Sequence, residues 1–328
     1  MPTSHDFHHI VPCRRPHPRH TRRLTIHLIG CLTAVLIFCP TAADLRVVTT
    51  TSDLASITRS VGGDLVEVQS ITRGHQDAHT VQAKPSFMRR LNRADLLIYT
   101  GLELEVGWLP LLIRGARNPA VAVGAMGHLN AATADLPILE KPEGPVDRSM
   151  GDVHPEGNPH YLLDPRNGPR VAGLIAGRLA RLDPDNASVY ADHLESYTAE
   201  LGSRIALWER RTEHLRGRAI VTYHAQWEYL MHWLGIDIVE SVETKPGIPA
   251  SPRHVASLVS RMRKEDIGIL VCANYLDPRA AQQVAVRAGA VHLVLPVSPG
   301  GEVDTDDYID LFEHLITRLV ESFGDRAP

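Results

Sequence analysis

The side chains best suited to chemistry in this 328-residue chain are histidines in polar segments rich in turn residues. The segment 151–165, GDVHPEGNPHYLLDP, holds His154 and His160 among prolines and glycines, and the apolar pair Leu162 and Leu163 would anchor it. The segment is too polar to be core. It predicts either an ordinary surface turn with a solvated histidine or a loop that holds a ligand, and the rest of the chain must decide between them.

Two further polar segments with histidine follow predicted strands. Residues 74–85, GHQDAHTVQAKP, come after a strand predicted at 66–71, and His224 closes a strand predicted at 218–224. Ligands of parallel α/β sheets collect outside the carboxyl ends of the strands. The three histidine-bearing segments therefore stand where a ligand site is expected, provided that the chain forms such sheets.

Alternating β-branched and helical segments predict two sheets of this kind. In the first half we expect helices beginning near Ser52, Pro85 and Glu105 between short strands at 45–50, 66–71, 95–101 and 120–125. In the second half, helices beginning near Gln226, Pro252, Pro278 and Thr305 alternate with strands at 218–224, 236–243, 267–273 and 291–297. This alternation is typical of an α/β protein, here with two lobes, each a mostly parallel sheet flanked by helices.

One long helical segment, 184–215, separates the two halves. Its apolar residues recur at spacings of three and four, and Asp185 or Asn186 is placed to cap its start. About 30 residues of helix would span on the order of 45 Å. We therefore expect a backbone helix that joins an N-terminal α/β lobe (44–183) to a C-terminal α/β lobe (216–328), each with a core of its own.

The first 43 residues have the layout of a secretory signal peptide. Five arginines and one aspartate precede a 16-residue apolar run at 24–39, and small residues follow at 41–43. The run is short for the roughly 20 residues that a bilayer requires. We expect cleavage before Asp44 and a periplasmic protein. A lipoprotein-like stretch at 28–31 precedes most of the apolar run, which favours simple cleavage over lipid anchoring.

Removal of the signal changes both the charge and the cysteine count. The whole chain has a formal net charge of −4, and the signal carries five arginines and Asp6, so that −8 remains. No basic run is left, which argues against nucleic acid as a partner. Three of the four cysteines leave with the signal, and Cys272 alone cannot form an intrachain disulfide. Core packing must therefore hold the exported chain together.

Several segments together resemble the zinc- and manganese-binding receptors of bacterial metal-uptake ABC transporters, periplasmic proteins with a long backbone helix. HQDAHTVQAKPS is similar to that family's Asp-Pro-His segment, GNPHYLLDP to its Pro-His-aromatic-x-x-Asp-Pro segment, and VTYHAQWEYLMHWLGI to its strand–His–helix segment. LDPDNASVYADHLESY is similar to the family's helix entry, and NRADLLIYTGLELEVGWLP to a strand and helix of its first lobe. The matching segments occur in the family's order and cover nearly all of the chain from Asp44 onward.

By position, the resemblance implies that His79, His160 and His224 bind a metal ion, the first two from the N-terminal lobe and the third from the C-terminal lobe. Three neutral imidazoles and one further group complete a tetrahedral zinc site. The chain departs from the family at the fourth ligand, because the stretch 296–301 stands where many members carry an aspartate. The candidates for this fourth ligand are Glu302, Asp304, Glu243, His154 and a water molecule.

Other polar residues are expected to play ordinary roles. The chain lacks the histidine-rich insertion of many zinc receptors, since 136–150 contains no histidine. Asp77 and Asp164 are expected to orient loops or the ligands' second nitrogens, and Glu103 and Glu105 to lie at a helix N-terminus. We expect solvated or structural roles for eight histidines: His75, His128, His193, His214, His232, His254, His292 and His314.

The implied function is a substrate-binding receptor that captures a divalent metal ion in the cleft between two lobes and delivers it to the permease of an ABC transporter. Zinc is favoured over manganese because the implied ligands are nitrogens, whereas manganese prefers oxygen. We expect a monomer without enzymatic activity. One rival function is a zinc-dependent hydrolase with a three-histidine site, against which stands the lack of HExxH and Gly-x-Ser-x-Gly motifs. A second rival is a periplasmic metal chaperone or adhesin.

Overall fold

The computed structural model describes residues 45–142, 144, 154–245 and 248–324. They all belong to one compact unit, Thr41–Pro328. The predicted signal peptide, 1–43, lies outside the described residues. Within the described ranges, none of the helices combines the length and the apolar character that crossing a bilayer requires.

The first sheet is parallel and has the strand order β2-β1-β3-β4. Its helices alternate with its strands as the sequence predicts, with α1 on one face and α2 and α3 on the other. The elements are β1 (Leu45–Thr49), α1 (Ser52–Gly62), β2 (Val66–Ser70), α2 (Pro85–Arg93), β3 (Leu96–Tyr99), α3 (Leu109–Ala116) and β4 (His128–Asn130).

Strand β3 shows why a continuous apolar run suits this sheet. Leu96 and Ile98 belong to the core that α1 covers, whereas Leu97 packs with Leu91 of α2 and Leu112 of α3. Successive side chains of a strand point to opposite faces. A strand that is covered on both faces must therefore be apolar at every position, as strands of parallel sheets are.

The second sheet repeats this arrangement with the order β6-β5-β7-β8, again all parallel. The two sheets flanked by helices confirm the predicted α/β class. The elements are β5 (Ala219–Thr222), α6 (Glu228–Leu234), β6 (Asp237–Ser241), α7 (Pro252–Lys264), β7 (Ile269–Ala273), α8 (Pro278–Ala288), β8 (Val291–Leu295) and α9 (Tyr308–Gly324).

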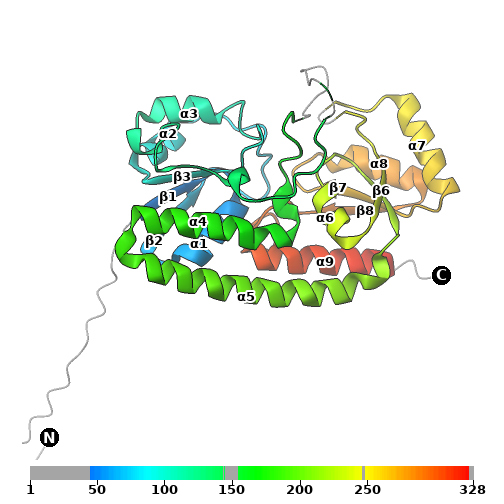
Figure 1. The fold of residues 1–328 in the computed structure, drawn as a ribbon. Helices are drawn as coiled ribbons and strands as arrows, with labels where there is room; N and C mark the ends of the chain where they lie inside the picture. The colour runs from blue at the N-terminus through cyan, green and yellow to red at the C-terminus, as the bar shows by residue number, and fades with distance from the viewer. Residues whose placement is uncertain (1–44, 143, 145–153, 246–247, 325–328) are drawn as a thin grey trace, which may run out of the picture. The chain divides into compact units, whose positions relative to one another are not determined.

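Two helices connect the sheets along the chain, α4 (Gly168–Leu182) and the long α5 (Ala187–Thr212), which contacts α4, α1 and α9 (Figure 1). The predicted cap of α5 is wrong in its mechanism. Asn186 occupies the cap position, but its side chain makes no capping hydrogen bond and donates instead to Asp183 Oδ2 at 2.8 Å. Tyr190 donates to the same oxygen at 2.7 Å. The lobe boundaries placed on either side of this helix stay a prediction.

The expectation of one core per lobe is only partly right. The outer faces of the sheets have separate cores, one around α2 and α3 and one around α7 and α8. The inner faces share a single core, which includes Ile98 of the first sheet and Val271 of the second. Trp208 of α5 joins this core and stacks on Phe312 of α9 with ring centroids 5.6 Å apart.

The strand predicted at 120–125 is wrong, and the fourth strand of the first sheet is β4, a few residues later. Pro119–Val121 forms a 3-10 turn that Asn118 caps by accepting a hydrogen bond from the Ala120 N–H at 3.0 Å. Gly124 has a φ of 85°, which breaks any extended run. The alternation of alanine and valine resembles a strand, but proline and glycine at its two ends decide the local structure.

Candidate metal centre

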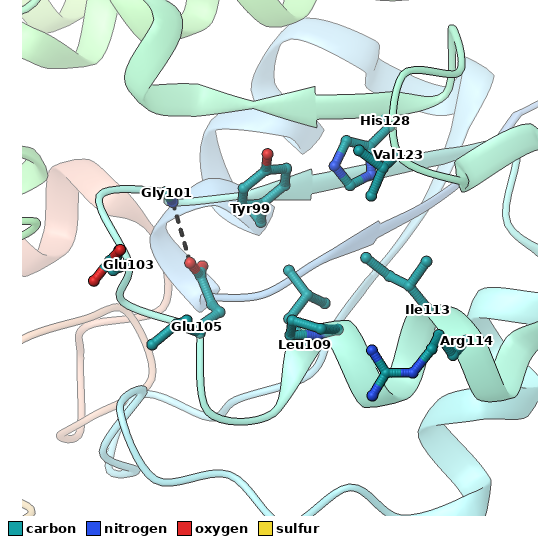
Figure 2. A pocket seen from close by; sticks show the side chains of 11 residues that line it. Tyr99, Gly101, Glu103, Glu105, Leu109, Ile113, Arg114, Val123 and His128 are labelled. Atoms are coloured by element: carbon teal, nitrogen blue, oxygen red, sulfur yellow. Dashed lines mark hydrogen bonds between the residues drawn. The ribbon is translucent and has the colours of Figure 1, made fainter.

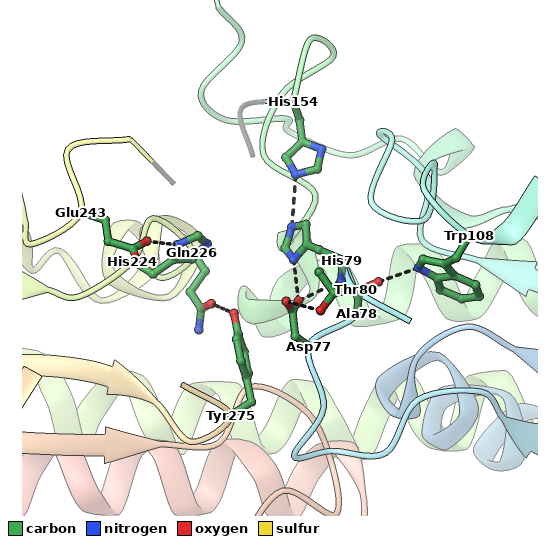
Figure 3. Close-up of polar contacts among 10 residues, drawn as sticks. All are labelled: Asp77, Ala78, His79, Thr80, Trp108, His154, His224, Gln226, Glu243 and Tyr275. Atoms are coloured by element: carbon green, nitrogen blue, oxygen red, sulfur yellow. Dashed lines mark hydrogen bonds and ion pairs between the residues drawn. The ribbon is translucent and has the colours of Figure 1, made fainter. Parts of the chain in front are cut away.

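His79 lies in the segment between β2 and α2, and Asp77 fixes its orientation (Figure 3). Asp77 Oδ1 accepts from the His79 backbone N–H at 2.9 Å and lies 2.8 Å from the ring nitrogen Nδ1. Thr80 donates to the other carboxylate oxygen at 3.0 Å. Burial raises the pKa of Asp77, but the hydrogen bonds from His79 and Thr80 outweigh it and lower the pKa to about 2. The ionised carboxylate therefore holds the proton on Nδ1 and leaves Nε2 free to face the site.

The segment with His154 and His160 is a tightly bonded loop. The Gly157 N–H donates to the His154 carbonyl at 3.1 Å, and Gly157 has a φ of 109°, which a side chain would disfavour. Asn158 then accepts from the His160 N–H through Oδ1 at 2.9 Å. The buried Tyr161 donates to the Thr100 carbonyl, at the end of β3, at 2.8 Å. These bonds set the position of both histidines.

His224 follows β5 of the second sheet and is buried. Its Nδ1 lies 2.8 Å from Glu243 Oε2, which stands just beyond β6 (Figure 3). This pair repeats the Asp77–His79 arrangement in the other lobe. Metal-bound histidines characteristically give their second nitrogen to a carboxylate or carbonyl, which orients the ring. Glu243, one of the candidates for the fourth ligand, is thus engaged with the far side of His224.

The imidazole rings from these three segments converge. The ring centroid of His79 lies 5.3 Å from that of His160, 5.3 Å from that of His154 and 6.4 Å from that of His224. Rings bound to one tetrahedral zinc, with Zn–N of about 2.0–2.1 Å, have centroids roughly 5.2 Å apart. Two of the three separations match this value, and His224 stands about 1 Å too far away.

The imidazoles thus have nearly the spacing of a metal site, with the His224 ring slightly too far from His79. Among the described residues, no group of three or more His, Cys, Asp or Glu side chains is already in position to hold a metal ion. Burial, followed by the charge of His79, lowers the pKa of His154 to about 4 and that of His160 well below its usual range. Both rings are therefore neutral near pH 7, the form that binds metal.

The other candidates for the fourth ligand, and the remaining histidines with ring hydrogen bonds, lie outside the imidazole cluster. Glu302 and Asp304 are exposed, and their charges act on His314 of α9 and not on His154 or His160. Asp164 caps the turn Pro165–Asn167, and Arg166 pairs with it at 2.6 Å. Asp164 therefore orients its own loop. Other histidines bond to backbone carbonyls outside the cluster, His128 to Val121, His193 to Val61 and His254 to Ser241.

Glu105 is buried, and the expectation that it lies at a helix N-terminus is wrong, because α3 begins only at Leu109. Its carboxylate accepts from Thr50 Oγ1 at 2.6 Å and from the backbone N–H of Thr100 at 2.7 Å. It also accepts from the backbone N–H of Gly101 at 3.1 Å (Figure 2). Burial raises its pKa. Glu105 thus holds the end of β3, whose Thr100 carbonyl in turn supports the His160 loop.

Asn158 and Gln226 are contributors to the site that the sequence alone did not indicate. The Asn158 amide donates to Glu140 at 3.0 Å and to Glu228 of α6 at 3.1 Å, so it ties the His160 loop to the second lobe. Gln226 is fully buried and accepts from Tyr275 (Figure 3). Only the position of Asn158 directly before Pro159 and His160 could have pointed to its role.

Two parallel sheets flanked by helices, with imidazoles from both at their junction, define a two-lobed α/β binding protein. The chain matches the family model described as ZnuA, zinc-uptake complex component A periplasmic, over residues 47–322. It therefore belongs to the ZnuA family of metal-binding receptors of ABC transporters.

Individual relatives agree with this assignment. The chain is 25% identical over 298 residues to the metal ABC transporter substrate-binding lipoprotein ScbA of Streptococcus cristatus, covering 86% of this chain and 90% of ScbA. It is 27% identical over 246 residues to the manganese ABC transporter substrate-binding lipoprotein PsaA of Streptococcus pneumoniae, covering 74% and 76%. A crystal structure of ZnuA has the same fold, with a TM-score of 0.71 and 21% identity over 85% of this chain and 98% of that one.

Proposed function

We propose that this receptor captures zinc between its two lobes through His79, His160 and His224 and delivers it to an ABC permease. The observation that carries the proposal is the convergence of three segments, distant in sequence, on one point with their rings 5.3 to 6.4 Å from that of His79. Carboxylates support the far side of two of the rings, which is typical of metal ligands.

Zinc is the metal that these side chains suit best. Imidazole nitrogens favour zinc, copper, nickel and iron, whereas manganese and magnesium favour carboxylate and carbonyl oxygens. PsaA is named as a manganese protein, so the family as a whole does not decide the metal. In this chain the carboxylates that contact the clustered histidines, Asp77 and Glu243, are occupied by imidazole Nδ1 atoms.

Capture would couple the two lobes, because His224 comes from the second sheet and the other two ligands from the first. A shift of about 1 Å would bring the His224 ring to zinc-bound spacing. The shared inner core opposes a wide hinge motion, so we infer a small closure of loops around the ion. A permease would then distinguish loaded from empty receptor by the positions of these loops.

We further propose that the mature chain, from Asp44 onward, works as a monomer in the periplasm. The composition of residues 1–43 supports export. The relatives ScbA and PsaA are named as lipoproteins, and the order of the apolar run in this chain supports a cleaved form without a lipid. Mass spectrometry of the exported protein would separate the two forms.

The test is zinc titration of metal-free protein beginning at Asp44, by calorimetry and in competition with a chelator. His79→Ala, His160→Ala and His224→Ala should each weaken zinc binding by more than about 100-fold, beyond the loss that removal of an outer partner produces. His75→Ala is the matched control, since His75 is exposed in the same segment as His79. Unchanged affinity in all three variants, or no zinc binding by the parent protein, would refute the proposal.

A further inference from the structure

His154 faces the same point as the three proposed ligands. Its Nε2 lies 3.2 Å from Nε2 of His79, and the two ring centroids are 5.3 Å apart (Figure 3). Two nitrogens bound to one tetrahedral zinc lie roughly 3.3 Å apart. The pair thus has the spacing of two ligands of one zinc ion.

The hydrogen bonds explain how two nitrogens come to face each other at this distance. Asp77 lies beside Nδ1 of His79 and directs Nε2 of that ring toward His154. One hydrogen between the two Nε2 atoms accounts for the contact. When both Nδ1 atoms carry the protons, the two Nε2 lone pairs are directed at one point, so that a zinc ion can bind there without a large movement of either ring.

His154 also has a partner on the side of its ring that faces away from His79, as His79 and His224 have on theirs. Its ring makes a hydrogen bond to the backbone of Leu102, in the segment that follows β3. Leu102 has a φ of 50°, which is rare for a residue with a side chain. Asp77 supports His79 and Glu243 supports His224 in the same way. An orienting partner of this kind is expected for a ligand and is not needed by a solvated surface histidine.

The acidic candidates for the fourth ligand do not reach this point. Glu302 and Asp304 are exposed near His314, and Glu243 contacts the far nitrogen of His224. The segment after β8, where the family's aspartate would fall, brings Ser298 to the small cavity beside His79 and His160. A hydroxyl there offers no negative charge to a cation.

From these contacts we propose that His154 is the fourth ligand, so that zinc is held by four imidazoles. The inference rests on the proposed function and accounts for the metal selectivity of the site. Four nitrogen ligands without a carboxylate oxygen select zinc strongly against manganese. The loss of an acidic ligand after the last strand is thereby compensated by a histidine from the loop of the second ligand segment.

X-ray absorption of the zinc-loaded protein measures the number of imidazoles directly. We expect four in the parent protein and three in His154→Ala and His154→Gln, with zinc affinity at least about 10-fold lower in both variants, which retain a three-histidine site. His154→Asp should restore affinity for zinc in part and raise the ratio of manganese to zinc affinity. His75→Ala should change neither quantity.

Three imidazoles in the parent protein, with unchanged affinity in His154→Ala, would overturn the assignment of His154 and leave the proposed function intact. A parent protein that binds no zinc would refute both. The melting temperatures of the metal-free variants show whether they are folded. His154→Gln preserves the size and polarity of the side chain, so that a loss of affinity in this variant reports coordination.

Discussion

At the scale of residues, carboxylates at the second nitrogen of two of the metal-facing imidazoles, His79 and His224, set the orientation of the rings. Asp77 holds His79 and Glu243 holds His224, at 2.8 Å in both cases. A neutral imidazole can rotate and exchange its protonated nitrogen unless a fixed partner selects one arrangement. The carboxylates therefore determine which nitrogens the metal meets, although they do not touch it.

Removal of these carboxylates should weaken zinc binding without unfolding the protein. We expect Asp77→Ala and Glu243→Gln each to lower zinc affinity by about 10–100-fold, the usual effect of losing an orienting partner. Glu240→Gln is the matched control, because Glu240 pairs with Arg261 and His254 outside the cluster. Calorimetric titration gives the affinities. Equal losses in the Glu240 and Glu243 variants would contradict the assigned role.

Glu228 gives the stability of the protein a pH dependence of a specific sign. Burial, followed by the charge of Glu140, raises the pKa of Glu228 to about 8. The folded protein therefore keeps a proton that the unfolded chain loses above about pH 4.5. The stabilisation is complete below that pH and disappears as the pH rises to about 8, because the unfolded state binds fewer protons throughout this window.

Glu228→Gln should remove this dependence. The amide is neutral at every pH and can still contact Asn158, so the variant should match the parent protein near pH 4 and exceed it at pH 8 by on the order of a few kcal/mol. Melting temperatures of the metal-free proteins across this range provide the measurement. A difference between the two proteins that does not grow with pH would show that Glu228 is ionised in the folded state.

At the scale of elements, the loops at the carboxyl ends of the strands meet backbone to backbone. A Cβ atom on Gly74, just after β2, would lie 2.3 Å from the Gly301 nitrogen and 2.3 Å from the Pro299 carbonyl oxygen, both beyond β8. Ser52 at the start of α1 donates to the same carbonyl at 2.8 Å. The loops of the two sheets therefore fit together only because Gly74 has no side chain.

Gly74→Ala should destabilise the protein by about 1–3 kcal/mol, the usual cost of overpacking, because the clashing atoms belong to backbone and cannot rotate away. Gly173→Ala is the control. Gly173 lies within α4, where an added Cβ meets nothing within 4 Å, and alanine there should stabilise the helix by up to about 1 kcal/mol. Urea denaturation measures both. Equal stability of the two variants would mean that the loops separate readily.

The sequence predicts elements well where one local signal dominates and poorly where two compete. Pro85, Pro252 and Pro278 mark helix starts that the structure confirms. The acidic Glu105 resembles a helix start but is fixed by partners from β1 and β3, which no local pattern reveals. His154 could not be assigned for the same reason, since its distance from His79 depends on contacts between segments 75 residues apart.

At the scale of the whole molecule, the assignment to a family rests on order and coverage. The match to residues 47–322 includes both sheets and the helix between them, which single motifs would not establish. The site itself follows from how the sheets are oriented, because the segments with His79 and His224 both continue from the carboxyl ends of parallel strands. The choice of metal depends on finer spacing than this topology fixes.

The core shared by the inner faces has a consequence for genetics and engineering. One hydrophobic core contains Ile98 of the first sheet, Val271 of the second, and the stacked pair Trp208 and Phe312. Neither half therefore retains a complete core when the other is deleted. A truncated gene would yield a chain with a large exposed apolar surface, which is prone to aggregation and proteolysis. Recombination between distant homologues should therefore succeed at the outer helices and fail at the junction, where both halves must be inherited together.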